Sequence, residues 1–282
     1  METALEGTGK VVYIAPDRPT AIIGERINPT GRKRLAAELV AGNLDIVRDE
    51  AVAQVGAGAD VIDVNVGAAG VDQVELLPRA VEIVQEVVDA PISIDTPDPA
   101  ALAAALKVYQ GKPLVNSVNG EERSLNQVLP LVAEHGAAVI GLCMDEDGIP
   151  NDPGVRLEIA RKIIERAEAL DIPREDVLID CLALTVGTDS SAALVTLEAI
   201  RMVRAELGVN MTLGASNVSF GLPDRHVINW AFLAMVIAAG VNAPIVNPAR
   251  VRPAILAADV LMGKDEFAMR YIRHYRKKQE QV

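Results

Sequence analysis

Aromatic residues, histidines and cysteines are all scarce in this chain of 282 residues. Aromatics make up 3% of it, and it has three histidines and two cysteines, whereas 50% of its residues are hydrophobic. Small and branched aliphatic side chains must therefore fill the core, as they do in closed α/β barrels. Cys143 and Cys181 form no CxxC pair, which argues against a secreted disulfide framework and favours reduced thiols in the cytoplasm.

The sequence also lacks the features that mark membrane, nucleic-acid and metal proteins. No apolar run approaches the roughly 18 residues of a membrane span, and the acidic N-terminus has no apolar signal core. A net charge of −12, with no basic stripe before the last segment, argues against a nucleic-acid partner. The histidines and cysteines lack the spacing of a zinc site. We therefore expect a cytoplasmic protein that binds no metal, membrane or nucleic acid.

Short β-branched runs alternate with longer amphipathic stretches along the whole chain. The stretches have the apolar periodicity of helices, as in residues 155–170 and 191–207. There are eight short runs, at residues 21–28, 60–67, 91–96, 113–118, 137–144, 176–182, 211–216 and 243–248. Near-continuous apolar runs are typical of parallel strands buried on both faces. Eight such units, with no GxGxxG or Walker motif to indicate an open sheet, predict a single-domain (β/α)8 TIM barrel over residues 20–262.

Two segments fall outside the eight units. Residues 11–19 precede the first predicted strand, and we expect them to cover the N-terminal opening of the barrel. Residues 264–282 are predicted to form a charged helix outside it. Their basic residues, Arg270, Arg273, Arg276, Lys277 and Lys278, are consistent with docking of an acidic partner protein, with a solvated helix or with packing in a dimer.

Polar residues gather where the predicted strands end. These residues are Glu25, Arg26, Asn28, Asp63, Asn65, Asp95, Thr96, Asn116, Ser117, Asn119, Asp180, Ser216, Asn217, Ser219 and Asn247. Asn and Asp are ordinary turn and capping residues, so any one of them has an alternative explanation. As a set they predict a ring of carboxylates and amides at the C-terminal mouth, where barrel enzymes carry their chemistry. An ionised Asp accepts two adjacent hydrogen bonds, which matches the two parallel donors of a pterin ring.

Six motifs in order resemble those of the pterin-binding methyltransferases. This family includes the methyltetrahydrofolate:corrinoid protein methyltransferases and the folate module of cobalamin-dependent methionine synthase. The motifs are GERIN, IDVNVG, SIDT, VNSVNG, IDCL and GASNVSFGLPDR, and the resemblance covers residues 20–262. It implies a homodimeric TIM barrel that moves the N5-methyl group between methyltetrahydrofolate and the cobalt of a corrinoid (cobalamin) carried by a partner protein.

The resemblance also implies a role for individual residues. Asn217 takes the position of the amide that reaches N5, and it is our candidate catalytic residue. The implied substrate-binding residues are Asp63, Asn65, Asp95, Asn116, Asp180, Ser219 and Arg225, with Glu25, Arg26 and Asn28 as supporting residues beneath the ring. The chain has no DxHxxG-type cobalamin-binding pattern, so the corrinoid must come from outside it.

Two other functions remain open at this point. Dihydropteroate synthase also binds a pterin in such a barrel, but the chain has INPTG at its first strand end and no Lys near its seventh or eighth. A non-catalytic folate-binding protein is the second alternative. Asn217 distinguishes it from a methyltransferase, because binding of the ring alone does not require an amide at N5.

Overall fold

Eight parallel strands close into a barrel in the computed structural model. The structure describes residues 1–279, with the side chain of Lys278 excepted. The strand order is β10-β3-β4-β5-β6-β7-β8-β9. The strands are β3 (Ile23–Ile27), β4 (Val61–Val64), β5 (Ile92–Asp95), β6 (Leu114–Asn119), β7 (Ala138–Leu142), β8 (Val177–Asp180), β9 (Met211–Gly214) and β10 (Ala243–Val246). Seven of them lie within the predicted runs and β6 extends one residue beyond its run, to Asn119, so the predicted (β/α)8 barrel is confirmed.

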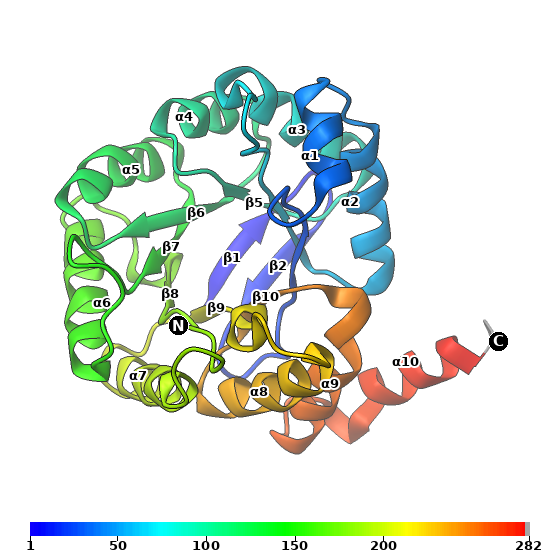
Figure 1. The fold of residues 1–282 in the computed structure, drawn as a ribbon, viewed down its shortest axis with the longest axis vertical. Coiled ribbons are helices and arrows are strands. Elements are labelled where there is room, and N and C mark those ends of the chain that lie inside the picture. The colour runs from blue at the N-terminus through cyan, green and yellow to red at the C-terminus, as the bar shows by residue number, and fades with distance from the viewer. Residues whose placement is uncertain (280–282) are drawn as a thin grey trace.

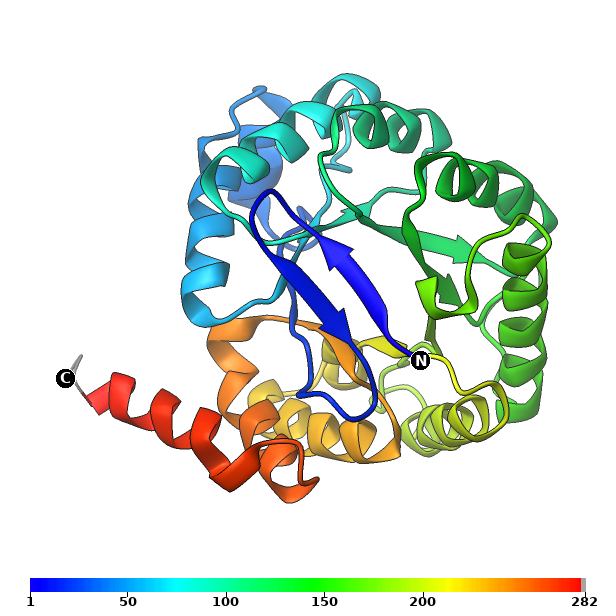
Figure 2. The ribbon, with the colours of Figure 1, turned by 180° about the vertical axis from the view of Figure 1, so that it is seen from behind.

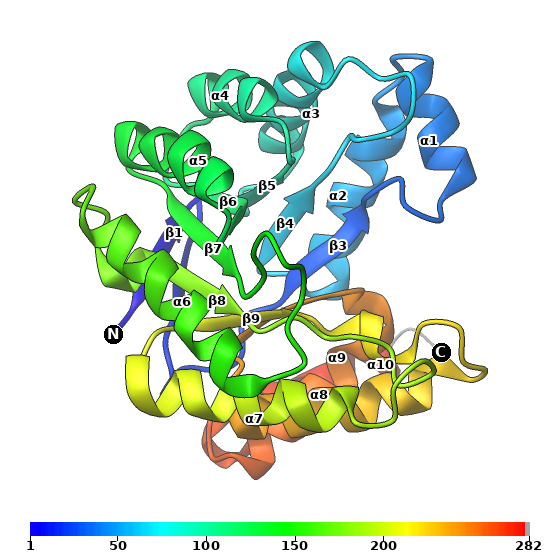
Figure 3. The same cartoon turned by 60° about the vertical axis from the view of Figure 1, so that its left-hand side comes forward.

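Helices form a ring around the strands (Figures 1 and 3). They are α1 (Lys33–Val40), α2 (Asp45–Ala57), α3 (Gln73–Val87), α4 (Pro99–Val108), α5 (Glu122–His135), α6 (Pro153–Glu168), α7 (Ala192–Leu207), α8 (Arg225–Ala239) and α9 (Pro248–Leu261). Asp72, Asp98 and Asp152 start α3, α4 and α6 by accepting hydrogen bonds from backbone N–H groups of the first turn. These caps orient the helices that follow the strand ends. In the part of the chain described, no helix is long and apolar enough to cross a membrane.

An antiparallel hairpin closes the N-terminal end of the barrel (Figure 2). It consists of β1 (Thr3–Glu6) and β2 (Val11–Ile14). Leu5 and Ile14 are buried there in a cluster with the first residues of the barrel strands, such as Val61 and Leu114. The prediction that residues 11–19 cover this opening is confirmed for β2, whereas the pairing of β2 with β1 was not predicted. Because this end is sealed, the opposite end is the one open to a ligand.

The C-terminal segment leaves the barrel after α9. A short 3₁₀ helix, η3 (Glu266–Ala268), leads into α10 (Met269–Gln279), which projects from the ring of helices (Figure 1). Arg270 on α10 pairs with the buried Asp259 of α9 at 3.0 Å, and this contact ties the helix to the barrel. Of the predicted charged helix over residues 264–282, the structure forms an α-helix from Met269 to Gln279, and residues 264–268 precede it as a loop and the 3₁₀ helix. Residues 280–282 of that prediction lie outside the described residues.

Candidate active site

Neighbouring strand ends bring a buried carboxyl group and two donors together at the mouth. Asp63 is buried next to the end of β4, and its Oδ1 accepts hydrogen bonds from Ser93 Oγ at 2.7 Å and Asn116 Nδ2 at 3.1 Å. The β6–β7 register shifts after Asn116, as it does in a β-bulge. Bulges re-aim side chains next to active sites. The shift thus accounts for two consecutive polar residues, Asn116 and Ser117, near one strand end.

Asp63 and Asp95 form a carboxyl pair with distinct roles. Burial, followed by the negative charge of Asp95, raises the pKa of Asp63 well above its usual value. Burial also raises the pKa of Asp95, to about 6, although hydrogen bonds from Asn65 and Asp63 act against this rise. Two carboxylates side by side cannot both ionise freely. Because the pKa of Asp63 is raised further than that of Asp95, Asp63 is the member of the pair that favours the protonated form, and its carboxyl group is hydrogen-bonded to Asp95.

Asp180 provides a second carboxylate across the mouth. Its Oδ1 accepts from the Leu182 N–H at 2.7 Å and its Oδ2 from the Gly214 N–H at 3.1 Å. Burial raises its pKa to about 6, while these two N–H groups and the charge of Arg156 act in the opposite direction. Each carboxylate oxygen retains capacity for another donor. Asp180 is therefore held in place and can still receive two side-by-side hydrogen bonds.

Arg156 supports the loop after Asp180 from beneath. It is fully buried on α6, and its Nη1 donates to the carbonyl oxygens of Cys181 at 2.6 Å and Leu182 at 2.8 Å. The adjoining Leu182 has a φ of 61°, a left-handed conformation that a leucine rarely adopts. Buried charge is costly unless it is paired or fully hydrogen-bonded. We infer that Arg156 stabilises this strained turn, which directs a backbone N–H at Asp180.

The loop after β9 holds Asn217. It lies in a 3₁₀ helix, η2 (Ala215–Ser219), and its side chain is exposed. Within residues 1–279, its amide makes no side-chain hydrogen bond. It does not cap α8 either, because the N-cap residue there is Asp224. The amide is therefore free to meet a ligand.

The remaining predicted loop residues bind each other. Ser219 is buried; its hydroxyl donates to Asn229 Oδ1 at 2.7 Å and accepts from Arg225 Nε at 3.0 Å. Arg225 also donates to the carbonyl oxygen of Ser216 at 2.7 Å. Ser216 in turn donates to Glu25 at 3.0 Å, and burial raises the pKa of Glu25. These contacts fix the shape of η2, and the predicted substrate contacts of Ser219 and Arg225 stay predictions.

A cavity of about 590 Å³ opens beside β5 and β6. Of the predicted substrate-binding residues, Asp95 and Asn116 line it. Ser117, Arg123 and Gln127 also line it. Ligand sites typically span about 300–1,000 Å³. The cavity can thus hold the part of a folate-sized ligand that extends from the mouth. No group of three His, Cys, Asp or Glu placed to hold a metal ion occurs in residues 1–279.

Sequence reasoning missed Ser93, Arg123 and Arg156. Ser93 lies in the middle of the apolar run of β5 and has no feature in the sequence that distinguishes it from a packing residue. Arg156 does leave a trace, because it shares a helical stripe with the buried Ala160 and Ile163, at spacings of four and seven residues. A charged residue at a core position of a helix indicates a buried hydrogen-bonding role.

Sequence comparison assigns this barrel to a family of pterin-binding proteins. The family model described as "Pterin binding enzyme" matches residues 24–247, so the chain belongs to this family. It is 32% identical over 265 residues to a methylcorrinoid:tetrahydrofolate methyltransferase of Eubacterium limosum, an alignment covering 90% of this chain and 96% of that protein. It is 31% identical to a methionine synthase of Mycobacterium tuberculosis, across 89% of this chain but 22% of the synthase.

Solved structures with this fold include dihydropteroate synthases. The enzyme of Yersinia pestis has a TM-score of 0.71 at 18% identity, and the two chains are covered to 93% and 99%. That of Xanthomonas albilineans has a TM-score of 0.68 at 22% identity, with 92% and 98% covered. At these identities the likeness is one of fold alone.

Proposed function

We propose that this protein is a methyltransferase that moves the N5-methyl group between methyltetrahydrofolate and the cobalt of a corrinoid carried by a partner protein. The observation that carries the proposal is the pair of carboxylates at the ends of β5 and β8, the half-buried Asp95 and the buried Asp180, with the exposed amide of Asn217 in the loop after β9. The similarity to the Eubacterium limosum methyltransferase over 90% of this chain supports it.

The carboxylates bind the pterin ring in this proposal. Asp180 accepts the 2-amino group and the neighbouring ring N–H, because its two oxygens are held side by side by backbone donors. Asp95 accepts donors from the other side of the ring, with hydrogen bonds to Asn65 and Asp63 holding it in place. Asn116 is left to meet the remaining ring edge. Binding by these residues requires no metal.

Asn217 assists the transfer itself. When the methyl group passes to cobalt(I), the bond between N5 and the methyl carbon breaks, its electron pair stays on N5, and N5 takes up a proton from solvent to give tetrahydrofolate. A hydrogen bond that strengthens as this pair develops lowers the barrier. The side-chain amide of Asn217 supplies such a donor. No nucleophile–base pair is needed, because the enzyme forms no covalent intermediate in this reaction.

Methyl transfer assayed in both directions tests the proposed function. The purified protein should transfer a methyl group from methyltetrahydrofolate to free cob(I)alamin and from methylcobalamin to tetrahydrofolate, with the same rates after chelator treatment. The same protein is also assayed with a dihydropterin pyrophosphate and p-aminobenzoate, the substrates of dihydropteroate synthase, which is the alternative function. Turnover of that pair, or folate binding without any transfer, would falsify the proposal.

Folate binding should weaken as the pH falls below about 6. Asp95 and Asp180 have pKa values of about 6, and the pterin donors need both carboxylates ionised. Binding therefore competes with protonation, so the Kd rises as the pH decreases through these values and levels off above them. Two protonations together predict an increase of about tenfold to a hundredfold between pH 7.5 and about pH 5. Calorimetric titration across this range measures it, and a Kd that does not change would contradict the assigned roles.

Assembly and location belong to the same proposal. A corrinoid protein is the proposed partner, the protein is expected to be a homodimer, and the reaction is placed in the cytoplasm. Two large apolar side chains near the start of the C-terminal segment, Leu261 and Phe267, are each 84% exposed, which supports an interface there between two copies.

A further inference from the structure

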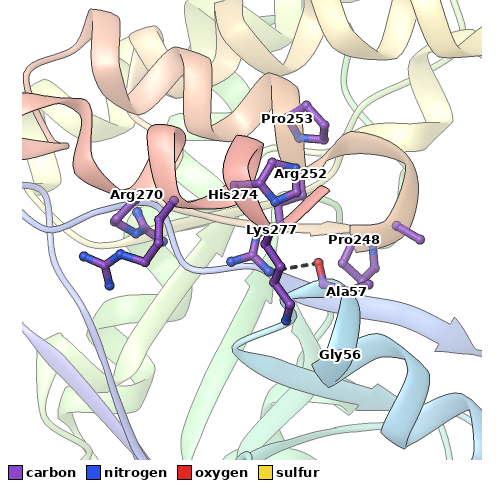
Figure 4. A pocket seen from close by; sticks show the side chains of 10 residues that line it. Gly56, Ala57, Pro248, Arg252, Pro253, Arg270, His274 and Lys277 are labelled. Carbon is purple, nitrogen blue, oxygen red and sulfur yellow. Dashed lines mark hydrogen bonds between the residues drawn. The ribbon is translucent and has the colours of Figure 1, made fainter. Parts of the chain in front are cut away.

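A cleft on the outer wall of the barrel is lined by cationic side chains. It lies between the end of α2, the start of α9 and α10, and has a volume of about 500 Å³ (Figure 4). The lining residues are Gly56, Ala57, Pro248, Ala249, Arg252, Pro253, Arg270, Arg273, His274 and Lys277. None of them is acidic, although the chain carries a net charge of −12. This concentration of positive charge runs against the overall balance of the protein.

Arg252 is fixed in the wall of the cleft. Its Nη1 donates to the carbonyl oxygen of Ala57 at 3.0 Å, at the end of α2 (Figure 4). Its guanidinium lies across Gly58, where an added Cβ would come within 1.4 Å of Nη1 and where φ is 99°. The conformation favours glycine at this position, and a larger residue would displace the guanidinium of Arg252. Within residues 1–279 this is the one hydrogen bond of Arg252, so most of its five N–H donors remain for a ligand.

The helix α10 presents its cations to the cleft as one stripe. Arg270, Arg273, His274 and Lys277 are spaced as neighbours on one helical face. Arg270 is paired with Asp259, but Arg273 and Lys277 form no ion pair within the part of the chain described. Figure 4 shows the side chain of Lys277 pointing toward the end of α2.

The nearest carboxylates are already engaged. Asp259 accepts from Thr20 as well as from Arg270, and Asp265 accepts from the backbone N–H groups at the start of α10. Asp60 attracts Arg252 but accepts from the Ile22 N–H and pairs with Lys10. The cleft therefore retains an excess of positive charge.

We propose that this cleft binds a small polyanion with two or more phosphate or carboxylate groups. The guanidinium group of an arginine can donate two parallel hydrogen bonds to a phosphate or to a carboxylate, and the ammonium group of a lysine adds a localised positive charge. The anion has two sources: a free polyphosphate, or the γ-linked glutamate chain of a folate. The second source rests on the proposed function. This second source is supported by the short path between the cleft and the mouth. Pro248 lines the cleft, and the preceding residue, Asn247, makes a backbone hydrogen bond to Glu25 in the mouth.

Binding of inorganic pyrophosphate and of tri-γ-glutamate to the full chain tests the proposal. Calorimetry at fixed ionic strength, without folate or corrinoid, should show saturable binding of at least one of them at one site per chain. Arg273→Gln should weaken it about tenfold, since it removes a donor of charge-assisted hydrogen bonds. Arg276→Gln removes the same charge from the same helix but lies outside the cleft lining, and it should leave the affinity unchanged.

Each outcome has a defined meaning. Binding of pyrophosphate alone assigns the site to phosphate ligands, binding of triglutamate alone assigns it to the folate chain, and binding of both supports a general polyanion site. The proposal is overturned if neither probe saturates, or if Arg276→Gln weakens binding as much as Arg273→Gln does. Because no methyl transfer is measured, this result is independent of the test of the proposed function.

Discussion

Replacing Asp95 with alanine should weaken methyltetrahydrofolate binding about tenfold to a hundredfold while leaving the melting temperature at or above that of the wild-type protein. The loss of affinity follows from removing an ionised acceptor, which leaves ring donors unsatisfied at a cost of about 1.5–3 kcal/mol. Asp180→Ala should weaken binding by a similar factor. Calorimetric titration of the purified variants with folate measures both effects.

The stability of the Asp95→Ala variant follows from the raised pKa values of the carboxyl pair. A carboxyl group whose pKa is higher in the folded state stabilises the fold below its unfolded value and loses this contribution as the pH rises through the folded value. At neutral pH the ionised Asp95 is therefore a destabilising group, and it also raises the pKa of Asp63. Alanine removes that charge, which offsets the lost hydrogen bonds to Asn65 and Asp63.

Asp98→Ala is the matched control in the same loop. Asp98 caps α4 by accepting from the Ala100 N–H at 2.8 Å and the Ala101 N–H at 3.4 Å. Its loss should lower the stability by about 1 kcal/mol without changing the folate affinity. The two variants should thus show opposite patterns. Two results would contradict the assignment of Asp95 to the binding site. One is normal folate affinity in Asp95→Ala, and the other is a loss of affinity that the unfolded fraction of the variant fully explains.

The barrel is predictable from the sequence because the same local pattern recurs eight times. Each strand is a short apolar run, and the caps at Asp72, Asp98 and Asp152 mark where helices begin. Parallel strands then place every strand end at one mouth, so the ring of polar residues follows from topology alone. The pairing of β1 with β2 is less accessible, because Thr3–Glu6 begins and ends with a polar residue and is not a continuous apolar run.

The different roles of the site residues cannot be predicted from the sequence. Asp63 and Asp95 lie at or next to the end of a strand and look equivalent, but burial and the charge of Asp95 raise the pKa of Asp63 further than that of Asp95. The support of the turn after Asp180 by Arg156 depends on packing between α6 and the end of β8. These two elements are separate in the sequence, and only the fold brings Arg156 to this turn. The cationic cleft likewise combines α2 with α10, and only tertiary packing brings Arg252 next to Lys277.

Asn217→Ala should slow methyl transfer at saturating folate about tenfold to a hundredfold without lowering the melting temperature. Losing one donor that acts in the transition state typically costs about a hundredfold to a thousandfold in rate. We expect a smaller loss because the side chain of Asn217 is exposed, so water can partly replace the amide. Stability should be retained because the amide makes no side-chain hydrogen bond in residues 1–279 and does not cap α8.

Asn229→Ala provides the matched control, since it removes the same amide from a structural position. The Oδ1 atom of Asn229 accepts from Ser219 at 2.7 Å and ties η2 to α8. Its loss should lower the melting temperature and leave the chemical step less affected than Asn217→Ala does. Single-turnover transfer at saturating folate, measured beside thermal unfolding, separates the two variants. If Asn217→Ala raised only the Kd and spared the single-turnover rate, Asn217 would be a binding residue, because an interaction made only in the transition state must lower that rate when it is removed.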